Sequence, residues 1–173
     1  MKDVERAYLA GLFDGEGSTE VTFSPSPKPS AHAQTGFKDY PNCRVQFIIT
    51  NTEERVLKEI HNIIDGKGRR YCQKRKEGKD LYRLVVYTPP EVKEMVELIK
   101  PFVRVKAEEL KSLGEATDLI LKLRGSGTKV RWTENAQKEF IRLAKKSRTL
   151  RGSSGSPRGR PRKRPEIATL RVQ

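Results

Sequence analysis

The stretch Leu9-Ala10-Gly11-Leu12-Phe13-Asp14-Gly15-Glu16-Gly17 decides how the chain is organised. Its bulky apolar residues, with those just before it, are spaced for one or two adjoining faces of a helix. Gly15 and Gly17 stop that helix, so Glu16 is expected at its end rather than along its side. Ser18 to Phe23 alternates in polarity and predicts a strand that follows almost directly.

The residues downstream predict two hairpins separated by a helix. Ser24 to Asn42 is a Pro/Ser/Gly-rich loop that leads to a second strand, Arg44–Ile49. Thr50-Asn51-Thr52 is expected to cap the helix that follows, with acids in its first turn. Arg69–Lys74 and Leu81–Tyr87 flank a glycine-containing turn and predict the second hairpin.

Three further helices are predicted after the second hairpin. Thr88-Pro89-Pro90 begins the first, with proline at its first position. The second is expected from about Lys106 to Leu123 with an interruption at Gly114, and Trp132-Thr133-Glu134 opens the last. This order predicts an α+β fold of the type αββαββα, in which one antiparallel four-stranded sheet carries helices on one face. The other face is left for a ligand.

The charge balance points to a polyanionic partner. The chain has 173 residues, and 36 Lys and Arg against 22 Asp and Glu give a net charge of +14. Such an excess indicates nucleic acid more often than an anionic membrane surface. Residues 148–173 hold eight of the cations and one acid, and their Gly/Ser/Pro/Arg composition cannot build a core. We therefore expect a domain over residues 1–147 and an extended or disordered basic tail over residues 148–173.

Several other classes of protein are excluded by simple patterns. There is no apolar run of the ~20 residues that a membrane helix needs, and the charged N-terminus does not resemble a signal peptide. The only two cysteines, Cys43 and Cys72, exclude a disulfide framework, and their spacing from His32 and His61 matches no zinc-finger pattern. The expected location is a reducing intracellular compartment, either a prokaryotic cytoplasm or an organelle, and not secretion.

Glu16 is the first candidate for a catalytic, metal-binding residue. An acid at the C-terminal end of a helix is unfavourable, because the helix dipole is negative there. A divalent cation would reverse that penalty if it were bound by Glu16 together with a free carbonyl such as that of Gly15. The alternative is that Gly-Glu-Gly is only a helix-stop turn with a solvated acid.

Polar side chains of both hairpins share one face by alternation. Arginine and glutamine suit bidentate contacts with guanine and adenine edges in the major groove. The alternative is a solvated polar face. The candidate DNA-contacting residues are Glu20, Thr22, Ser24, Arg44, Gln46, Ile48, Arg69, Tyr71, Gln73, Arg75 and Arg83.

A further basic motif lies in the tail. Pro157-Arg158-Gly159-Arg160-Pro161-Arg162-Lys163 resembles an AT-hook. Its core can lie extended in a narrow A·T minor groove with Arg158 and Arg160 in the enhanced negative potential. General attraction to phosphate is the alternative.

The nine-residue stretch from Leu9 to Gly17 resembles the signature of LAGLIDADG homing endonucleases. Six of its nine positions are identical to the consensus, and Glu16 conservatively replaces the final acid. The resemblance covers roughly residues 5–146 and implies a saddle-shaped sheet. It also implies intron-encoded, metal-dependent hydrolysis of DNA, with Mg²⁺ as the metal, Mn²⁺ as a substitute, and Ca²⁺ supporting binding without cleavage.

The resemblance implies three further catalytic positions around the attacking water and the scissile phosphate. Here these are Asn51, Arg55 and Lys106. Each also has a structural interpretation: Asn51 as part of a helix cap, Arg55 as a partner of Glu59, and Lys106 as a solvated helix-start residue. Asp14 is expected to cap or pack rather than to bind the metal.

A homodimer is the expected assembly, because the motif occurs once and cutting two strands needs two sites. The small residues Ala10 and Gly11 would let two helices approach closely. The implied product is a staggered double-strand break in a pseudo-palindrome of about 20 base pairs, with no small-molecule substrate. The alternatives are a binding-only relative, acting as intron RNA maturase or regulator, and a basic architectural protein. The expected interface residues are Leu9, Ala10, Gly11, Leu12, Phe13 and Asp14.

Overall fold

The helix that carries the Leu9–Gly17 stretch leads without a linker into the first strand of a four-stranded sheet. The computed structural model describes residues 1–24, 41–124, 130 and 132–153. Its elements are α1 (Asp3–Glu16), β1 (Gly17–Ser24), β2 (Asn42–Asn51), α2 (Glu54–Ile63), β3 (Arg69–Gln73), β4 (Leu81–Val86), α3 (Pro89–Ile99), α4 (Ala107–Arg124) and α5 (Glu134–Ser153). The predicted α+β class and the αββαββα order are confirmed.

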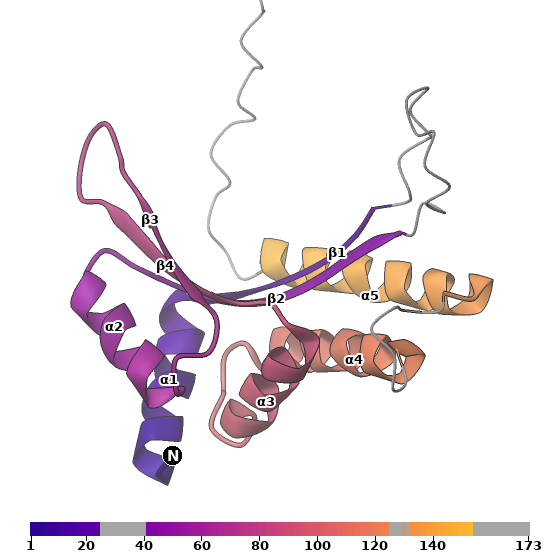
Figure 1. Ribbon diagram of the computed structural model, residues 1–173, viewed down its shortest axis with the longest axis horizontal. Coiled ribbons are helices and arrows are strands. Elements are labelled where there is room, and N and C mark those ends of the chain that lie inside the picture. Colours follow the sequence, from indigo (N-terminus) through magenta and orange to yellow (C-terminus); the bar gives the residue numbers. More distant parts are fainter. Residues whose placement is uncertain (25–40, 125–129, 131, 154–173) are drawn as a thin grey trace, which may run out of the picture.

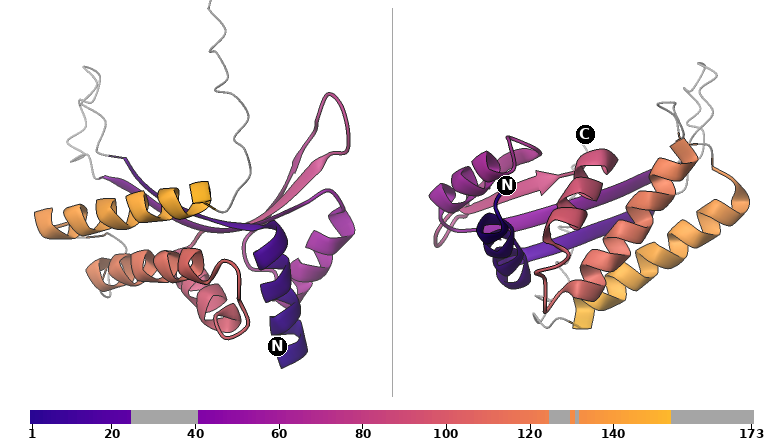
Figure 2. Two further views of the ribbon diagram at one scale, coloured as in Figure 1. Left: turned by 180° about the vertical axis from the view of Figure 1, so that it is seen from behind. Right: turned by 90° about the horizontal axis from the view of Figure 1, so that it is seen from below.

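The sheet is antiparallel throughout, with the strand order β1-β2-β4-β3. Figure 1 shows α1 to α4 on one side of the sheet, while the ends of both hairpins curve away from those helices. The helix-free face is therefore concave. The last helix, α5, lies along the edge strand β1 and beside α4, as Figure 2 shows from below.

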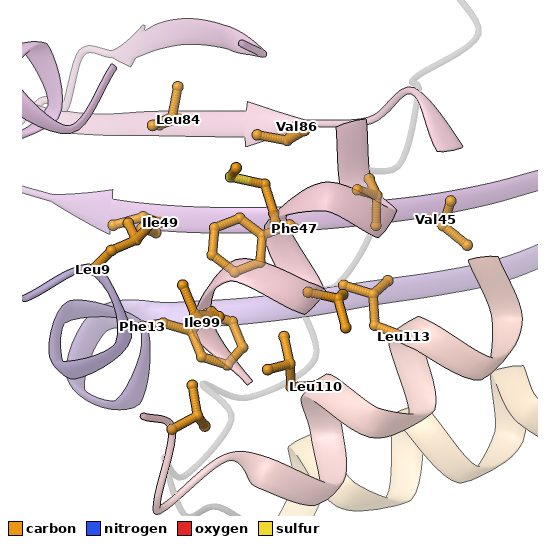
Figure 3. Packing of buried hydrophobic residues seen from close by; sticks show 14 of the residues in the cluster. Leu9, Phe13, Val45, Phe47, Ile49, Leu84, Val86, Ile99, Leu110 and Leu113 are labelled. Atoms are coloured by element: carbon orange, nitrogen blue, oxygen red, sulfur yellow. The ribbon is translucent and has the colours of Figure 1, made fainter. Parts of the chain in front are cut away.

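The core fills the space between the inner face of the sheet and the helices. Leu9 and Phe13 of α1 are fully buried against Phe47 and Ile49 of β2 (Figure 3). The Phe13 and Phe47 rings stack with their centroids 4.9 Å apart. Burying each such side chain contributes about 1.5–3 kcal/mol, so the nine-residue stretch is anchored to the sheet by its own apolar residues.

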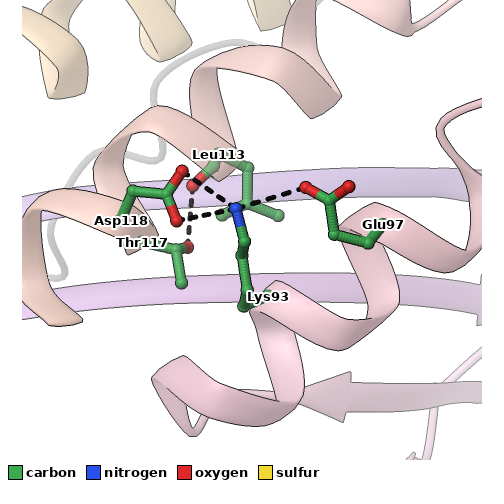
Figure 4. Close-up of polar contacts among 5 residues, drawn as sticks. All are labelled: Lys93, Glu97, Leu113, Thr117 and Asp118. Carbon is green, nitrogen blue, oxygen red and sulfur yellow. Dashed lines mark hydrogen bonds and ion pairs between the residues drawn. The ribbon is translucent and has the colours of Figure 1, made fainter.

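The predicted interruption of the fourth helix at Gly114 is wrong. α4 runs unbroken from Ala107 to Arg124, and Gly114 is buried where α3 crosses it. A Cβ atom on Gly114 would lie 3.2 Å from Val96 Cγ1, so the glycine serves the close packing of two helices rather than a break. Beside this crossing Lys93 of α3 pairs with Asp118 of α4 at 2.7 Å (Figure 4).

Two predicted boundaries also shift. Asn51 ends strand β2 instead of lying in a helix cap, and the capping position of α2 is Glu53. The domain boundary expected after residue 147 falls inside α5, which continues to Ser153. Residues 148–153 of the expected tail are therefore helical, with Leu150 and Arg151 half-buried. Residues 154–173 lie outside the described part of the chain.

Candidate functional site

Glu16 is the last residue of α1, and its side chain is exposed at the junction with β1. The junction is tight because Gly17 follows at once: a Cβ atom there would lie 2.5 Å from the Phe13 carbonyl oxygen. Within the described residues, the Glu16 carboxylate has no hydrogen-bonding or ion-pair partner. The local fold thus presents an unpaired acid at the carbonyl end of a helix, as the sequence predicts.

Lys106 packs against the same helix end. Its Nζ donates hydrogen bonds to the Gly17 carbonyl at 2.7 Å and to the Phe13 carbonyl at 3.2 Å. The side chain is half-buried and lies over the Phe13 ring. A cation is favourable at this end of a helix, where the dipole is negative. Lys106 is therefore not a solvated helix-start residue but part of the α1–β1 junction that carries Glu16.

Asp14 holds the segment from which Lys106 projects. Its carboxylate accepts hydrogen bonds from the backbone N–H groups of Arg104, Val105 and Lys106 at 2.8, 3.1 and 2.9 Å. Partial burial acts to raise the pKa of Asp14, but the three backbone donors and the Lys106 charge outweigh it, so the pKa lies below its usual value. Asp14 joins α1 to the turn before α4, which agrees with a capping role.

Replacing Asp14 by asparagine should lower the free energy of unfolding by about 1–3 kcal/mol at pH 7, since charge-assisted hydrogen bonds are lost. The pKa of Asp14 is depressed in the folded state. Its contribution is therefore present above its ordinary pKa of about 3.9 and is lost as the pH falls through the lower folded value. Urea unfolding of wild type and Asp14→Asn at pH 7 and at pH 3 measures this contribution to the free energy of unfolding. A difference between wild type and Asp14→Asn that does not shrink at low pH would contradict the assignment.

Asn51 and Arg55 lie beyond the α1–β1 junction, at the end of β2 and the start of α2. Gly17 pairs with Ile49, so β2 continues two residues past the α1–β1 junction before ending at Asn51. The Asn51 Oδ1 accepts a hydrogen bond from the Glu53 N–H at 2.8 Å, which shapes the turn into α2. Arg55 is exposed in the first turn of α2, and in the described part of the chain no hydrogen bond or ion pair joins it to Glu16, Glu59 or Lys106.

The donors at the junction fit a hard divalent cation, which prefers carboxylate and carbonyl oxygens. The last carbonyls of a helix lack intrahelical partners. That of Phe13 accepts hydrogen bonds from the Gly17 N–H and from Lys106, and Lys106 also bonds the carbonyl of Gly17, the first residue of β1. Gly15 and Glu16 remain as donors. In residues 1–24, 41–124, 130 and 132–153, no three His, Cys, Asp or Glu side chains are grouped closely enough to hold a metal ion. Glu16 is the carboxylate that the α1–β1 junction presents to such a cation.

The strand register gathers the predicted polar residues on the concave face. Glu20 lies opposite Gln46, Thr22 opposite Arg44, and Tyr71 opposite Arg83, so these pairs share a face. Ser24, Ile48, Arg69 and Gln73 share it through the same alternation. No helix covers this face in the described structure (Figure 2).

Three of the predicted DNA-contacting residues are not placed on the concave face by the strand register. β3 ends at Gln73, so alternation does not extend to Arg75, which lies in the turn and whose backbone N–H bonds Asp80 at 3.2 Å. Arg158 and Arg160 lie outside the described residues. Tyr87, which the predicted set omits, directly follows β4 with the same parity as Arg83 and Val85, and the Arg69 guanidinium lies over its ring.

The expected dimer interface needs correction on α1. Leu9, Ala10 and Phe13 are fully buried in the core of their own chain, and a side chain so placed cannot contact a second copy. Leu12 and Asp14 are half-buried. The reason is the sheet, whose Phe47 and Ile49 cover that side of the helix. The sequence does not show which apolar face of α1 packs against the sheet.

A different stripe of α1 is free. It consists of Val4, Tyr8, Gly11 and Gly15, spaced four, three and four residues apart, which places them on one side of a helix. Val4 is 80% exposed and Tyr8 41% exposed, both unusual for large apolar side chains. Cβ atoms on Gly11 or Gly15 would meet nothing within 4 Å. We call these four residues the α1 stripe.

Solved structures share this architecture. The homing endonuclease I-CvuI bound to its target superposes with a TM-score of 0.64 at 20% identity, over 91% of this chain and 87% of that one. The archaeal intron-encoded I-Vdi141I, complexed with DNA, gives 0.66 at 19% identity, over 95% and 91%. The LAGLIDADG homing endonuclease I-GzeII with its DNA target gives 0.60 at 14% identity, over 80% of this chain but 43% of that longer one.

The chain has the LAGLIDADG homing endonuclease fold. The likeness extends over 80% or more of this chain in each of the three structures. No protein-family model and no curated protein matches the chain by sequence. In the described part of this LAGLIDADG fold, no helix is both long and apolar enough to span a membrane.

Proposed function

We propose that this chain is a site-specific DNA endonuclease of the intron-encoded homing type, and that it acts as a homodimer on a pseudo-palindromic site of about 20 base pairs. The observation that carries the proposal is the α1–β1 junction, where Glu16 has no partner among the described residues and the half-buried Lys106 bonds the carbonyl of the next residue, Gly17. Solved DNA complexes of homing endonucleases with the same fold support it.

The homodimer is proposed because one chain supplies one Glu16. Two strands of a duplex run in opposite directions, so a two-fold axis through the dimer would present one Glu16 to each strand. The α1 stripe, with exposed Val4 and Tyr8 and open Gly11 and Gly15, is the surface for that contact. Small residues on such a stripe let helix backbones approach closely. The product would be a staggered double-strand break.

The chemistry proposed at the junction is phosphodiester hydrolysis with Mg²⁺. Glu16 and the Gly15 carbonyl would hold the ion, which supplies Lewis-acid stabilisation and a more acidic bound water. I-CvuI has been crystallised with DNA both in Ca and in Mg, the latter with the DNA not cleaved. Lys106 places a positive charge at the same helix end as this acid, where it would offset charge that develops on the phosphate. Asn51 would orient water from the end of β2.

The concave face would bind the major groove of each half-site. Its arginines and glutamines have the donor and acceptor patterns that recognise guanine and adenine. The β3–β4 turn adds Lys74, Arg75, Lys76 and Lys79, which suit contacts with phosphates rather than bases. The protein's net charge of +14 gives a long-range attraction for DNA.

The experiment that tests this function is cleavage of plasmids carrying candidate insertion sites. The expected result is a single linear product in Mg²⁺ and a bound, uncut complex in Ca²⁺. Specific binding of DNA without any cut in Mg²⁺ or Mn²⁺ would instead identify a DNA-binding regulator. Binding of intron RNA alone would identify a maturase.

Replacing Lys106 by methionine should slow cleavage about 100-fold in single turnover, as expected for loss of one stabilising group. Binding in Ca²⁺ should change little. Because Lys106 also caps α1, thermal unfolding of the variant must be measured beside the rate. Lys111→Met removes an exposed lysine of α4 and serves as the charge control. Equal single-turnover rates for wild type and Lys106→Met would remove this residue from the catalytic site.

A further inference from the structure

Arg69 and Tyr87 touch on the concave face of the sheet. The Arg69 Cζ lies over the Tyr87 ring, 5.5 Å from its centroid. The register pairs Arg69 with Val85, so Tyr87 is a diagonal neighbour two residues along from that pair. Diagonal neighbours on one face of an antiparallel sheet are close enough for a long side chain to reach an aromatic ring. The contact is thus built into the register of β3 and β4.

The stacked arginine keeps its hydrogen-bond donors. Arg69 is exposed, and within the described residues it has no carboxylate partner. Arg70, the next residue, points to the opposite face and pairs there with Glu54 at 3.9 Å. Stacking uses the flat face of a guanidinium group and leaves its N–H edge available. Arg69 is therefore held in place without the use of its donors.

Tyr87 is placed to act as a platform. It is half-buried and lines a hollow at β2 between Arg44 and Gln46 of that strand and Ile120 and Trp132 on the helix side. A partly buried ring is more restrained than the exposed arginine that lies on it. An arginine that is ordered before binding loses less rotamer freedom when it meets its target, which improves affinity and selectivity together.

We propose that Tyr87 is a positioning residue that orients Arg69 toward a guanine at one defined position in each half of the DNA site. This inference rests on the proposed function, because the concave face must bind the major groove. The guanidinium fork matches the O6 and N7 acceptors of guanine, a pattern that no other base presents there. The cations of the β3–β4 turn lack such a platform in the described structure, and they serve phosphate contacts.

The test is selection from a randomised double-stranded DNA library by the full-length chain in Ca²⁺. The chain is compared with Arg69→Lys, Tyr87→Leu and Tyr87→Phe. Arg69→Lys should reduce the preference for guanine about 10-fold at one position of each half-site. Tyr87→Leu should reduce it about 3-fold at the same position. Tyr87→Phe keeps the ring and should behave as wild type. The salt dependence should be equal in all four proteins, since their charge is equal.

Several outcomes would overturn the proposal. If Tyr87→Leu keeps the guanine preference that Arg69→Lys loses, Tyr87 does not position Arg69. If Tyr87→Leu weakens selection evenly over the site, its role is only structural. Should thermal unfolding show that Tyr87→Leu is misfolded, Tyr87→Met fills the same space without a flat ring and carries the same expectation. Wild-type chain that selects no sequence would overturn the proposed function as well, whereas an unchanged Tyr87→Leu would overturn this inference alone.

Discussion

Replacing Glu16 by glutamine should abolish DNA cleavage and leave DNA binding nearly unchanged. The substitution keeps the size of the side chain but removes the charge that would hold Mg²⁺. A metal ion contributes several kcal/mol of transition-state stabilisation, so the single-turnover rate should fall by roughly 1,000-fold or more. Because Glu16 is exposed and has no partner in the described structure, folding should be unaffected. Cleavage in Mg²⁺ and binding in Ca²⁺ measure the two effects separately.

Two matched variants make this result specific. Glu16→Asp retains a carboxylate at the position and should retain measurable cleavage. Glu59→Gln removes an exposed acid from α2, away from the α1–β1 junction, and should cut at the wild-type rate. A Glu16→Gln protein that cuts as fast as wild type would disprove the metal assignment. Loss of binding in Ca²⁺ would show instead that Glu16 contributes to docking.

The sheet and its polarity were predictable from local patterns. Val21, Val45 and Phe47 alternate with polar residues in their strands, and a period of two assigns one face to the core. The order of strands and helices then follows from short connections and turn residues. The concave face was predictable for the same reason, because it carries the alternate strand residues whose side chains point away from the core.

The parts that could not be predicted depend on packing between distant segments. Asp14 and Lys106 meet across 92 residues of sequence, and no local pattern reports that contact. Gly114 reads as a helix breaker by propensity, but its role is set by Val96 of a neighbouring helix. The composition of residues 148–153 resembles a tail, yet α5, which packs along β1, continues through them to Ser153.

The Glu16 site itself was predictable because its signal is local. Two glycines around one acid at the end of an apolar helix specify the junction without knowledge of the fold. The interface on α1 was predictable only in part. The helix has apolar residues on adjoining faces. The sheet packs against the face with Leu9 and Phe13, so Val4 and Tyr8 stay exposed.

Replacing Gly11 by leucine should stabilise the isolated fold and disrupt the homodimer. Gly11 lies in the interior of α1, where leucine is better than glycine by about 0.8–1 kcal/mol. A Cβ atom there meets nothing within 4 Å among the described residues of its own chain, so the substitution creates no clash with them. In the proposed dimer, two leucines would be forced between closely packed helices. Overpacking costs about 1–3 kcal/mol per copy, so dimerisation should weaken about 30-fold or more.

Gly17 provides the matched control for the Gly11 prediction, because its Cβ atom would collide with the Phe13 carbonyl of the same chain. Gly17→Ala should therefore lower the melting temperature, whereas Gly11→Leu should maintain or raise it while double-strand cleavage is lost. Sedimentation equilibrium reports the assembly and calorimetry reports the fold, so the two effects are measured independently. A Gly11→Leu protein that stays dimeric and cuts both strands would exclude the α1 stripe as the interface. Wild-type chain that sediments as a monomer, both free and on DNA, would exclude the dimer itself, because one Glu16 per complex would then have to serve two strands.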